Sequence, residues 1–315
     1  MTMRRRLAIL LGACTLVACA TRSTSPATSL PPGAEARSLL GAPLVPVPPS
    51  AAAQARLSAQ LADAEREWRR DTTNADALIW YGRRLAYLGR YRDAIAAFTL
   101  GMRLHPRDAR FPRHRGHRHL TVRELDAAVR DFEAAAALVR GRPDEVEPDG
   151  QPNAANIPTS TLQFNIWYHL ALARHLQGDW RRALAAYDAC MRVSTNPDAI
   201  VATAYWQHMT ARLAGDSATA ARALAAASRI DRVIENDAYL RLVALYAGRV
   251  TPETLVPSRA ESLDDATTAY GVATWYALAG RSADADRLLA RVLAGPQWAS
   301  FGYLAAEARV ARTRR

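Results

Sequence analysis

The stretch Leu78-Ile79-Trp80-Tyr81-Gly82-Arg83-Arg84-Leu85, followed by Ala94-Ile95-Ala96-Ala97-Phe98 and then Pro106, decides the fold of this chain. Three of its positions return 34 residues later, because Gly82, Ala94 and Phe98 are matched by Gly116, Ala128 and Phe132. A recurrence at one spacing indicates a repeated structural unit, and a period near 34 residues is typical of a helix–turn–helix unit. The Ala- and Leu-rich composition also favours helices.

These positions resemble the tetratricopeptide repeat (TPR) family, whose pattern is W-x2-L-G-x2-Y, then A-x3-F, then P. Further units follow the first two, and their matching residues are Trp167, Leu170, Ala171, Ala183 and Tyr187 in a third unit and Tyr205, Trp206, Ala220 and Leu224 in a fourth. The resemblance implies an all-α fold, a superhelical array of antiparallel helix hairpins (a TPR-like α-solenoid). Residues 147–150, 156–161 and 164–168 also resemble a group of uncharacterised bacterial repeat proteins, which implies no particular activity.

The repeated residue types have geometric reasons. Small residues such as Gly82 and Ala94 let the two helices of a hairpin approach closely, and Phe98, Phe132 and Tyr187 are expected to fill the space between successive hairpins. Glycines stand where each first helix must stop and adopt a left-handed cap, and these are Gly89, Gly178, Gly215, Gly248 and Gly280. No hairpin can bury its apolar stripe alone, so stacking must do it.

The pattern predicts four parts of the chain. Residues 1–18 are a signal peptide and residues 19–50 a Pro/Ser/Ala-rich disordered tether. Residues 51–235 are the helical repeats, opened by one helix over 51–70 and interrupted by an insertion at 143–163. Residues 236–315 are degenerate repeats that end in a capping helix over 298–312.

The first residues resemble the export signal of bacterial lipoproteins. Arg4, Arg5 and Arg6 precede an apolar run that is too short to span a bilayer, and Leu16-Val17-Ala18-Cys19 resembles a lipobox. The resemblance implies that Cys19 is acylated and becomes the first residue of the mature protein. Cys14 also fits the box, but its apolar run would be shorter than the usual 7–15 or so residues. An ordinary secretory signal or an uncleaved anchor are the other interpretations.

Export sets the expected location and limits the cysteine chemistry. Ala20 stands where an Asp would resemble an inner-membrane retention signal, so we expect the outer membrane, facing the periplasm. With Cys14 removed and Cys19 acylated, Cys190 is left alone and no intramolecular disulfide can form. Cys190 lies at a small position of a second helix and is expected to be a packed thiol.

The net charge of +11 rests entirely on arginine, because the chain contains no lysine. Arginine suits bidentate contacts with carboxylates and phosphates. The alternative explanation is a GC-rich genome, in which Arg codons replace Lys codons. Nucleic acid is not expected as a partner, because an exported, membrane-tethered protein rarely meets it.

In the TPR family the first helix of each hairpin lines a concave face that binds peptides or protein segments. Mapped by repeat position, that face is expected to contain Ile79 and a set of candidate binding residues: Arg83, Arg113, His117, Tyr168, His175, Tyr205 and Arg212. Some family members hold a C-terminal carboxylate with a Lys/Asn clamp. Ile79 and Arg83 replace those residues here, which puts such a clamp in doubt.

The densest basic stretch, residues 107–123, has two interpretations: an anion-selective groove or a solvated helix face. The acidic first half of the insertion could instead fold against it and form internal ion pairs. His114, His117 and His119 do not share one helix face, and no Cys or carboxylate cluster completes a set of ligands. No metal site and no cofactor are therefore expected.

No catalytic motif of the hydrolase, P-loop, zinc-protease or dinucleotide-binding type occurs in the chain. The sequence thus favours a non-catalytic scaffold that binds a protein or peptide and touches the membrane only through its lipid. A protein that binds the cell wall or another envelope polymer is the alternative, and an enzyme with its site on the 143–163 insertion is a remote one.

The lipid anchor gives a direct prediction. Cys19→Ser removes the thiol that would carry the diacylglycerol, so metabolic labelling of the protein with a fatty acid should be lost. Cys14→Ser should leave the labelling unchanged. Labelling that persists in Cys19→Ser would contradict the assigned cleavage site.

Overall fold

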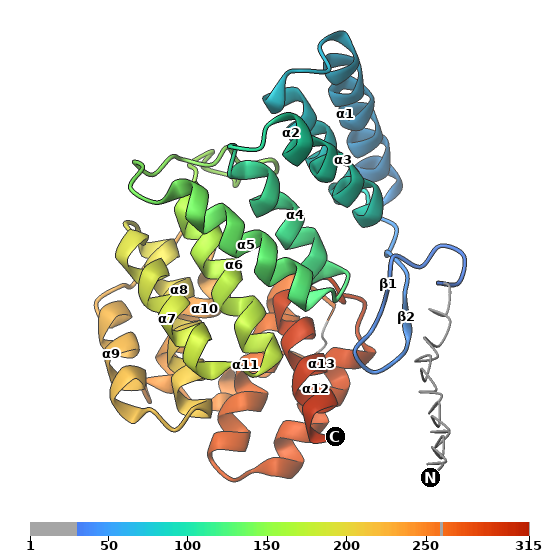
Figure 1. Ribbon diagram of the computed structural model, residues 1–315. Helices are drawn as coiled ribbons and strands as arrows, with labels where there is room; N and C mark the ends of the chain where they lie inside the picture. The colour runs from blue at the N-terminus through green and yellow to red at the C-terminus, as the bar shows by residue number, and fades with distance from the viewer. Residues whose placement is uncertain (1–29, 259–260, 315) are drawn as a thin grey trace, which may run out of the picture.

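The computed structural model describes residues 30–258 and 261–314. Within them the chain folds into thirteen α-helices, one 3₁₀ turn and a two-stranded antiparallel hairpin (Figure 1). In the hairpin Ala36 pairs with Leu44 and Arg37 with Pro43. The elements are β1 (Ala36–Arg37), β2 (Pro43–Leu44), α1 (Ala51–Arg70), α2 (Ala75–Tyr87), α3 (Tyr91–Leu104), α4 (Arg110–Thr121), α5 (Leu125–Val139), α6 (Leu162–Gln177), α7 (Trp180–Val193), α8 (Pro197–Leu213), α9 (Ser217–Ala227), α10 (Asp237–Tyr246), η1 (Pro252–Thr254), α11 (Leu263–Leu278), α12 (Ser282–Ala294) and α13 (Phe301–Thr313).

The helices pair as the repeat pattern predicts, α2 with α3, α4 with α5, α6 with α7 and α8 with α9. Phe98, Phe132 and Tyr187 are at most 1% exposed, so they fill the space between hairpins as expected. A Cβ at Gly82 would stand 2.5 Å from the Phe98 ring. Close approach therefore explains the small residue at this position, and the helical-array fold class is confirmed.

The five predicted cap glycines all adopt the left-handed conformation, with φ between 71° and 80°. The turn between α4 and α5 has no glycine, and Arg123 takes the equivalent conformation with φ 66°. A side chain is unfavourable there. At this turn the Arg123 side chain makes contacts that glycine cannot make.

Those contacts join the second repeat to the C-terminal helix. The Arg123 guanidinium donates to Glu307 Oε2 on α13 at 2.7 Å and to the carbonyl oxygen of Trp298 at 2.7 Å. The side chains of Arg123 and Glu307 are 3% and 1% exposed. Removal of either group would leave the other buried without its partner, which is costly.

The C-terminal third turns back into the array instead of extending it. Helix α10 packs on α8 and α11, and α13 packs on α11, α12 and α6. In Figure 1 the last helices lie beside the middle of the array and next to the N-terminal hairpin. The inner face of the repeats is therefore covered by the protein's own C-terminal helices.

The predicted disordered tether is wrong for residues 30–50. The β1–β2 hairpin packs against the C-terminal region, because the Leu39 N–H donates to Glu307 Oε1 and the Trp298 indole N–H donates to the Val45 carbonyl at 2.7 Å. The prolines predict the absence of a helix correctly, but they are compatible with this extended strap. Residues 1–29, which include the predicted signal, Cys14 and Cys19, lie outside the described residues.

The 143–163 insertion runs along the edge of the array and crosses several repeats. Arg84 on α2 donates to the Gly150 carbonyl at 3.0 Å, and Arg113 on α4 pairs with Glu147 at 2.8 Å. At the other end, Thr159 donates to Glu235 at 2.6 Å, just before α10. The ion-pair interpretation of the acidic loop is confirmed by the Arg113–Glu147 contact.

Among the described residues, no helix has the length and apolar character needed to cross a membrane.

Candidate functional site

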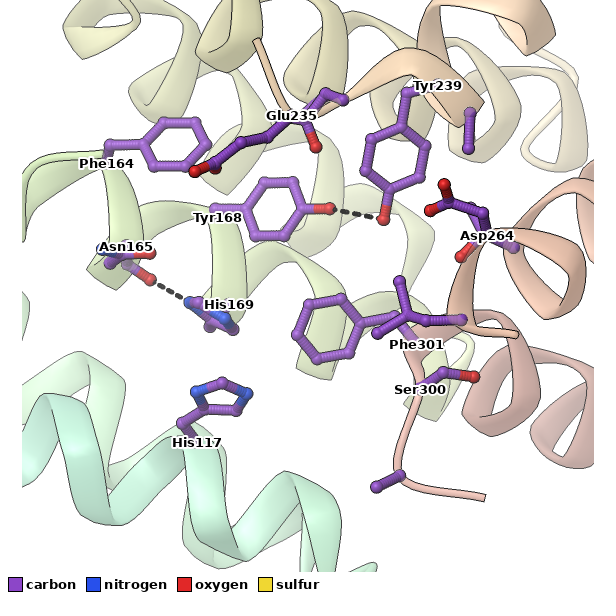
Figure 2. Close-up of a pocket in the computed structure, with 16 residues that line it drawn as sticks. His117, Phe164, Asn165, Tyr168, His169, Glu235, Tyr239, Asp264, Ser300 and Phe301 are labelled. Atoms are coloured by element: carbon purple, nitrogen blue, oxygen red, sulfur yellow. Dashed lines mark hydrogen bonds between the residues drawn. The ribbon is translucent and has the colours of Figure 1, made fainter. Parts of the chain in front are cut away.

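A cavity of about 380 Å³ remains where the C-terminal helices cover the inner face of the repeats (Figure 2). Its walls come from α4, α6, α8, α10, α11 and the turn before α13. This volume falls in the range of about 300–1,000 Å³ that is usual for ligand sites, and its location between helices is typical of them. We take it as the candidate site.

Four aromatic side chains line the cavity, and they are Phe164, Tyr168, Tyr239 and Phe301. Phe164 and Tyr168 stack with their ring centroids 5.3 Å apart, and the Tyr168 hydroxyl donates to the Tyr239 hydroxyl at 3.2 Å. Tyr239 in turn stacks on Tyr205 at 5.1 Å. Tyr168, Tyr239 and Phe301 each contact an aromatic side chain of another helix, so the wall is built from several elements packed together.

Two histidines complete one side of the cavity. The rings of His117 on α4 and His169 on α6 lie 4.4 Å apart, and His169 also meets the Phe301 ring edge-on at 5.4 Å. Burial, helped by the nearby charges of Arg113 and Arg118, lowers the pKa of His169 to about 3, and burial and Arg118 hold the pKa of His117 well below its usual value. Both rings are therefore neutral at neutral pH.

The mouth of the cavity is acidic. Glu235 and Asp264 line it and are both exposed. In Figure 2 they lie on the side that carries Tyr239, away from the two histidines. The cavity is thus apolar and uncharged inside and negative at its mouth.

Two of the seven predicted groove residues, His117 and Tyr168, line this cavity. Arg83 is half-buried and donates to the Tyr87 hydroxyl at 3.2 Å, while its guanidinium lies 4.4 Å from the centre of the Trp80 ring. Arg212 is exposed near the C-terminal end of α8 and is not part of the cavity.

The expectation of an open, partner-facing position is wrong for three of the seven. His175 and Tyr205 are 0% and 1% exposed, because α10 and α11 cover the faces of α6 and α8 that a plain solenoid would leave open. Arg113 is 6% exposed and is neutralised by Glu147 of the insertion. Tyr168, at 5%, reaches only the cavity.

Sequence reasoning missed His169, Tyr239, Asp264 and Phe301 as site residues. One signal was available: residues 166–173 of α6 form a long run with hardly any polar residue, and a helix that is apolar all round is buried on every face. That pattern predicts a second layer over α6. It does not identify which helix supplies the layer.

No group of three or more His, Cys, Asp or Glu side chains within residues 30–258 and 261–314 could hold a metal ion. The three histidines of the basic stretch have different partners, since His114 stacks on Phe98, His117 lies against His169 with tilted rings, and His119 contacts Glu124. Cys190 is fully buried, and burial raises the pKa of its thiol to about 12. Such a thiol is a packing group.

No protein-family model matches the chain, and no curated protein matches its sequence. Among solved structures it is similar to YrrB, described as a TPR protein with an unusual peptide-binding site (TM-score 0.42, 13% identity, 73% of this chain and 90% of that one). It is also similar to PilW, a type IV pilus biogenesis factor (TM-score 0.42, 15% identity, 74% of this chain and 83% of that one). A third similar structure is the Cut9–Hcn1 complex (TM-score 0.46, 17% identity, 76% of this chain and 40% of that one).

The buried histidines predict a loss of stability in acid. Thr210 uses its hydroxyl hydrogen on the Trp206 carbonyl, so His175 Nδ1 must donate to it, which leaves His175 Nε2 to accept from Tyr270. Burial lowers the pKa of His175 to about 3, below its value of 6.5 in the unfolded chain. The unfolded state therefore binds the proton first, and this stability is complete above pH 6.5 or so and is lost as the pH falls toward 3.

Between pH 7 and pH 5, His175 alone should lower the free energy of unfolding by about 2 kcal/mol. His175→Gln removes the titrating group, so its stability should fall less over this interval than that of the unmodified protein. Urea denaturation at pH 7, 6 and 5 measures both slopes. Equal slopes would show that His175 is not a buried neutral imidazole.

Proposed function

We propose that the protein is a non-catalytic interaction scaffold that receives a side chain of a protein or peptide partner in the aromatic cavity. The observation that carries this proposal is the cavity itself, a preformed hollow between six parts of the chain that the protein's own side chains leave unfilled. Preformed apolar pockets with few polar groups are suited to anchoring one side chain of a partner.

The location belongs to the same proposal. The lipobox around Cys19 supports export and acylation, and the absence of Asp after it supports the outer membrane and a periplasm-facing orientation. The membrane would then be contacted only through the lipid. The chain between Cys19 and the first described residues would link the lipid to the folded array.

Packing rather than acid–base chemistry dominates the cavity. Its two histidines are neutral, its two carboxylates lie at the exposed mouth, and Cys190 is a packed thiol elsewhere in the core. The insertion forms hydrogen bonds and an ion pair with α2, α4 and the residues just before α10. These features support a binding role over the remote alternative of an enzyme on the insertion.

Filling the cavity should abolish binding. Ala299 is half-buried at the cavity wall, and Ala299→Trp would place an indole in the space intended for the partner. A displayed library of random heptapeptides, selected on the unmodified protein, should yield ligands whose affinity falls by about tenfold or more in Ala299→Trp. Fluorescence anisotropy with synthetic copies of the selected peptides measures this.

Ala294→Trp is the matched control, since Ala294 is exposed at the end of α12 and outside the cavity. It should leave the affinity unchanged. Failure to select any peptide, or peptides that bind Ala299→Trp as tightly as the unmodified protein, would overturn the proposed function. Selective retention of purified peptidoglycan by the unmodified protein and by Ala299→Trp alike would favour the envelope-polymer alternative.

A further inference from the structure

The wall of the cavity carries a hydrogen-bond acceptor, Nε2 of His169. His169 Nδ1 lies against the Asn165 carbonyl, which can only accept, so the ring hydrogen is on Nδ1 and Nε2 carries a lone pair. His169 is 4% exposed, and its Nε2 has no hydrogen-bond partner among the described residues. Nε2 is not one of the fully buried unpaired atoms, so it is open to the cavity and can accept a hydrogen bond from water or from a bound ligand.

At the mouth of the cavity the hydrogen-bond acceptors are the charged carboxylates of Glu235 and Asp264. Asp264 has neither a hydrogen bond nor an ion pair through its carboxylate to any residue in the described part of the chain. Glu235 accepts from Asn153 at 2.7 Å and from Thr159 at 2.6 Å, two neutral donors that orient its carboxylate without neutralising it. Two negative charges therefore remain uncompensated beside the aromatic wall.

We propose that the cavity recognises a basic segment of its partner, in which a Trp side chain enters the cavity and an adjacent Arg or Lys lies at Asp264 and Glu235. The indole N–H can donate to the open Nε2 of His169, and the indole ring can pack against Phe164, Tyr168 and Phe301. This inference rests on the proposed function and specifies the chemistry of the partner.

Charge decides which part of the ligand goes inside. Burial, together with the charge of Arg118, lowers the pKa of His169 and of His117, so a cation placed deep in the cavity beside them would be disfavoured. A neutral aromatic group is favoured there, and the cation is favoured at the mouth, where Tyr239 offers a ring face and Asp264 a carboxylate. The net charge of +11 makes this acidic mouth a local exception on a basic protein.

The surface around the mouth also suits a peptide. Leu263, which lines the cavity, is 60% exposed, and Ile157 and Ile234 are 50% and 46% exposed. Ile157 and Ile234 lie near each other, because Asn153 donates both to the Ile157 carbonyl and to Glu235. Exposed apolar side chains around a pocket commonly contact the residues that flank an anchor.

The test uses the displayed heptapeptide library selected on the unmodified full-length protein. The selected pool should be enriched in Trp and, next to it, in Arg or Lys over Asp and Glu. Asp264→Asn should weaken a selected Trp–Arg peptide by about fivefold, as expected for one exposed ion pair near the upper end of its range. The analogue with Gln in place of Arg should bind Asp264→Asn and the unmodified protein equally well.

Asp286→Asn is the control, because it removes the same charge from an exposed position on α12 outside the cavity, and it should change neither affinity. A second comparison replaces the peptide Trp by naphthylalanine, which lacks the N–H. His169→Phe should abolish the preference for Trp over naphthylalanine.

The outcomes separate this inference from the proposed function. Peptides that lose affinity in Ala299→Trp but show no preference for basic residues, and no effect of Asp264→Asn, would overturn the inference and leave the scaffold function standing. If Asp264→Asn lowered the affinity for the Arg peptide and for its Gln analogue by the same factor, the inference would likewise be overturned. An absence of cavity-dependent peptides would overturn the proposed function itself.

Discussion

The buried ion pair between Arg123 and Glu307 is the interaction on which the rest of this structure depends. It joins residues 184 positions apart in the sequence, and Glu307 also accepts from Leu39 of the N-terminal hairpin. One carboxylate thus holds the second repeat, the C-terminal helix and the hairpin together. The left-handed backbone at Arg123, where every other predicted cap has glycine, shows the conformational cost of keeping that side chain.

The C-terminal helices cover the inner face of the repeats and so reduce the surface that a partner can reach. In an open solenoid the first helices of the hairpins present a continuous groove, whereas here α10, α11 and α13 cover much of that face, and the aromatic cavity lies between them and the repeats. Residues that would form a groove, such as His175 and Tyr205, become core. In the proposed function, binding takes place in this cavity, whose aromatic wall and acidic mouth suit one anchor side chain better than a long peptide.

The sequence predicted the local units well and their long-range arrangement poorly. The 34-residue recurrence placed the paired helices, Phe98 and Phe132 in the core, and the glycine caps, because these depend on short-range geometry. It could not predict that Glu307 meets Arg123, since a lone Glu in an Ala-rich helix does not reveal its partner. The error over residues 30–50 has the same origin: a Pro-rich segment lacks helix signals whether it is free or held by distant hydrogen bonds such as that from Trp298. His117 and Tyr168 were predicted because they occupy first-helix positions of the repeats. His169 was missed although it lies on the repeat helix α6, and Tyr239, Asp264 and Phe301 were missed because they come from the helices that fold back.

Amide hydrogen exchange of the unmodified protein and of Glu307→Ala tests the closed array most directly. The account predicts that α13 in the unmodified protein is as strongly protected as α6. Glu307→Ala should leave Arg123 uncompensated, cost about 3–5 kcal/mol, and speed exchange in α13 and in the hairpin strands β1 and β2 while α7 and α9 keep their protection. Rapid exchange of α13 in the unmodified protein, or protection that is unchanged by Glu307→Ala, would contradict it.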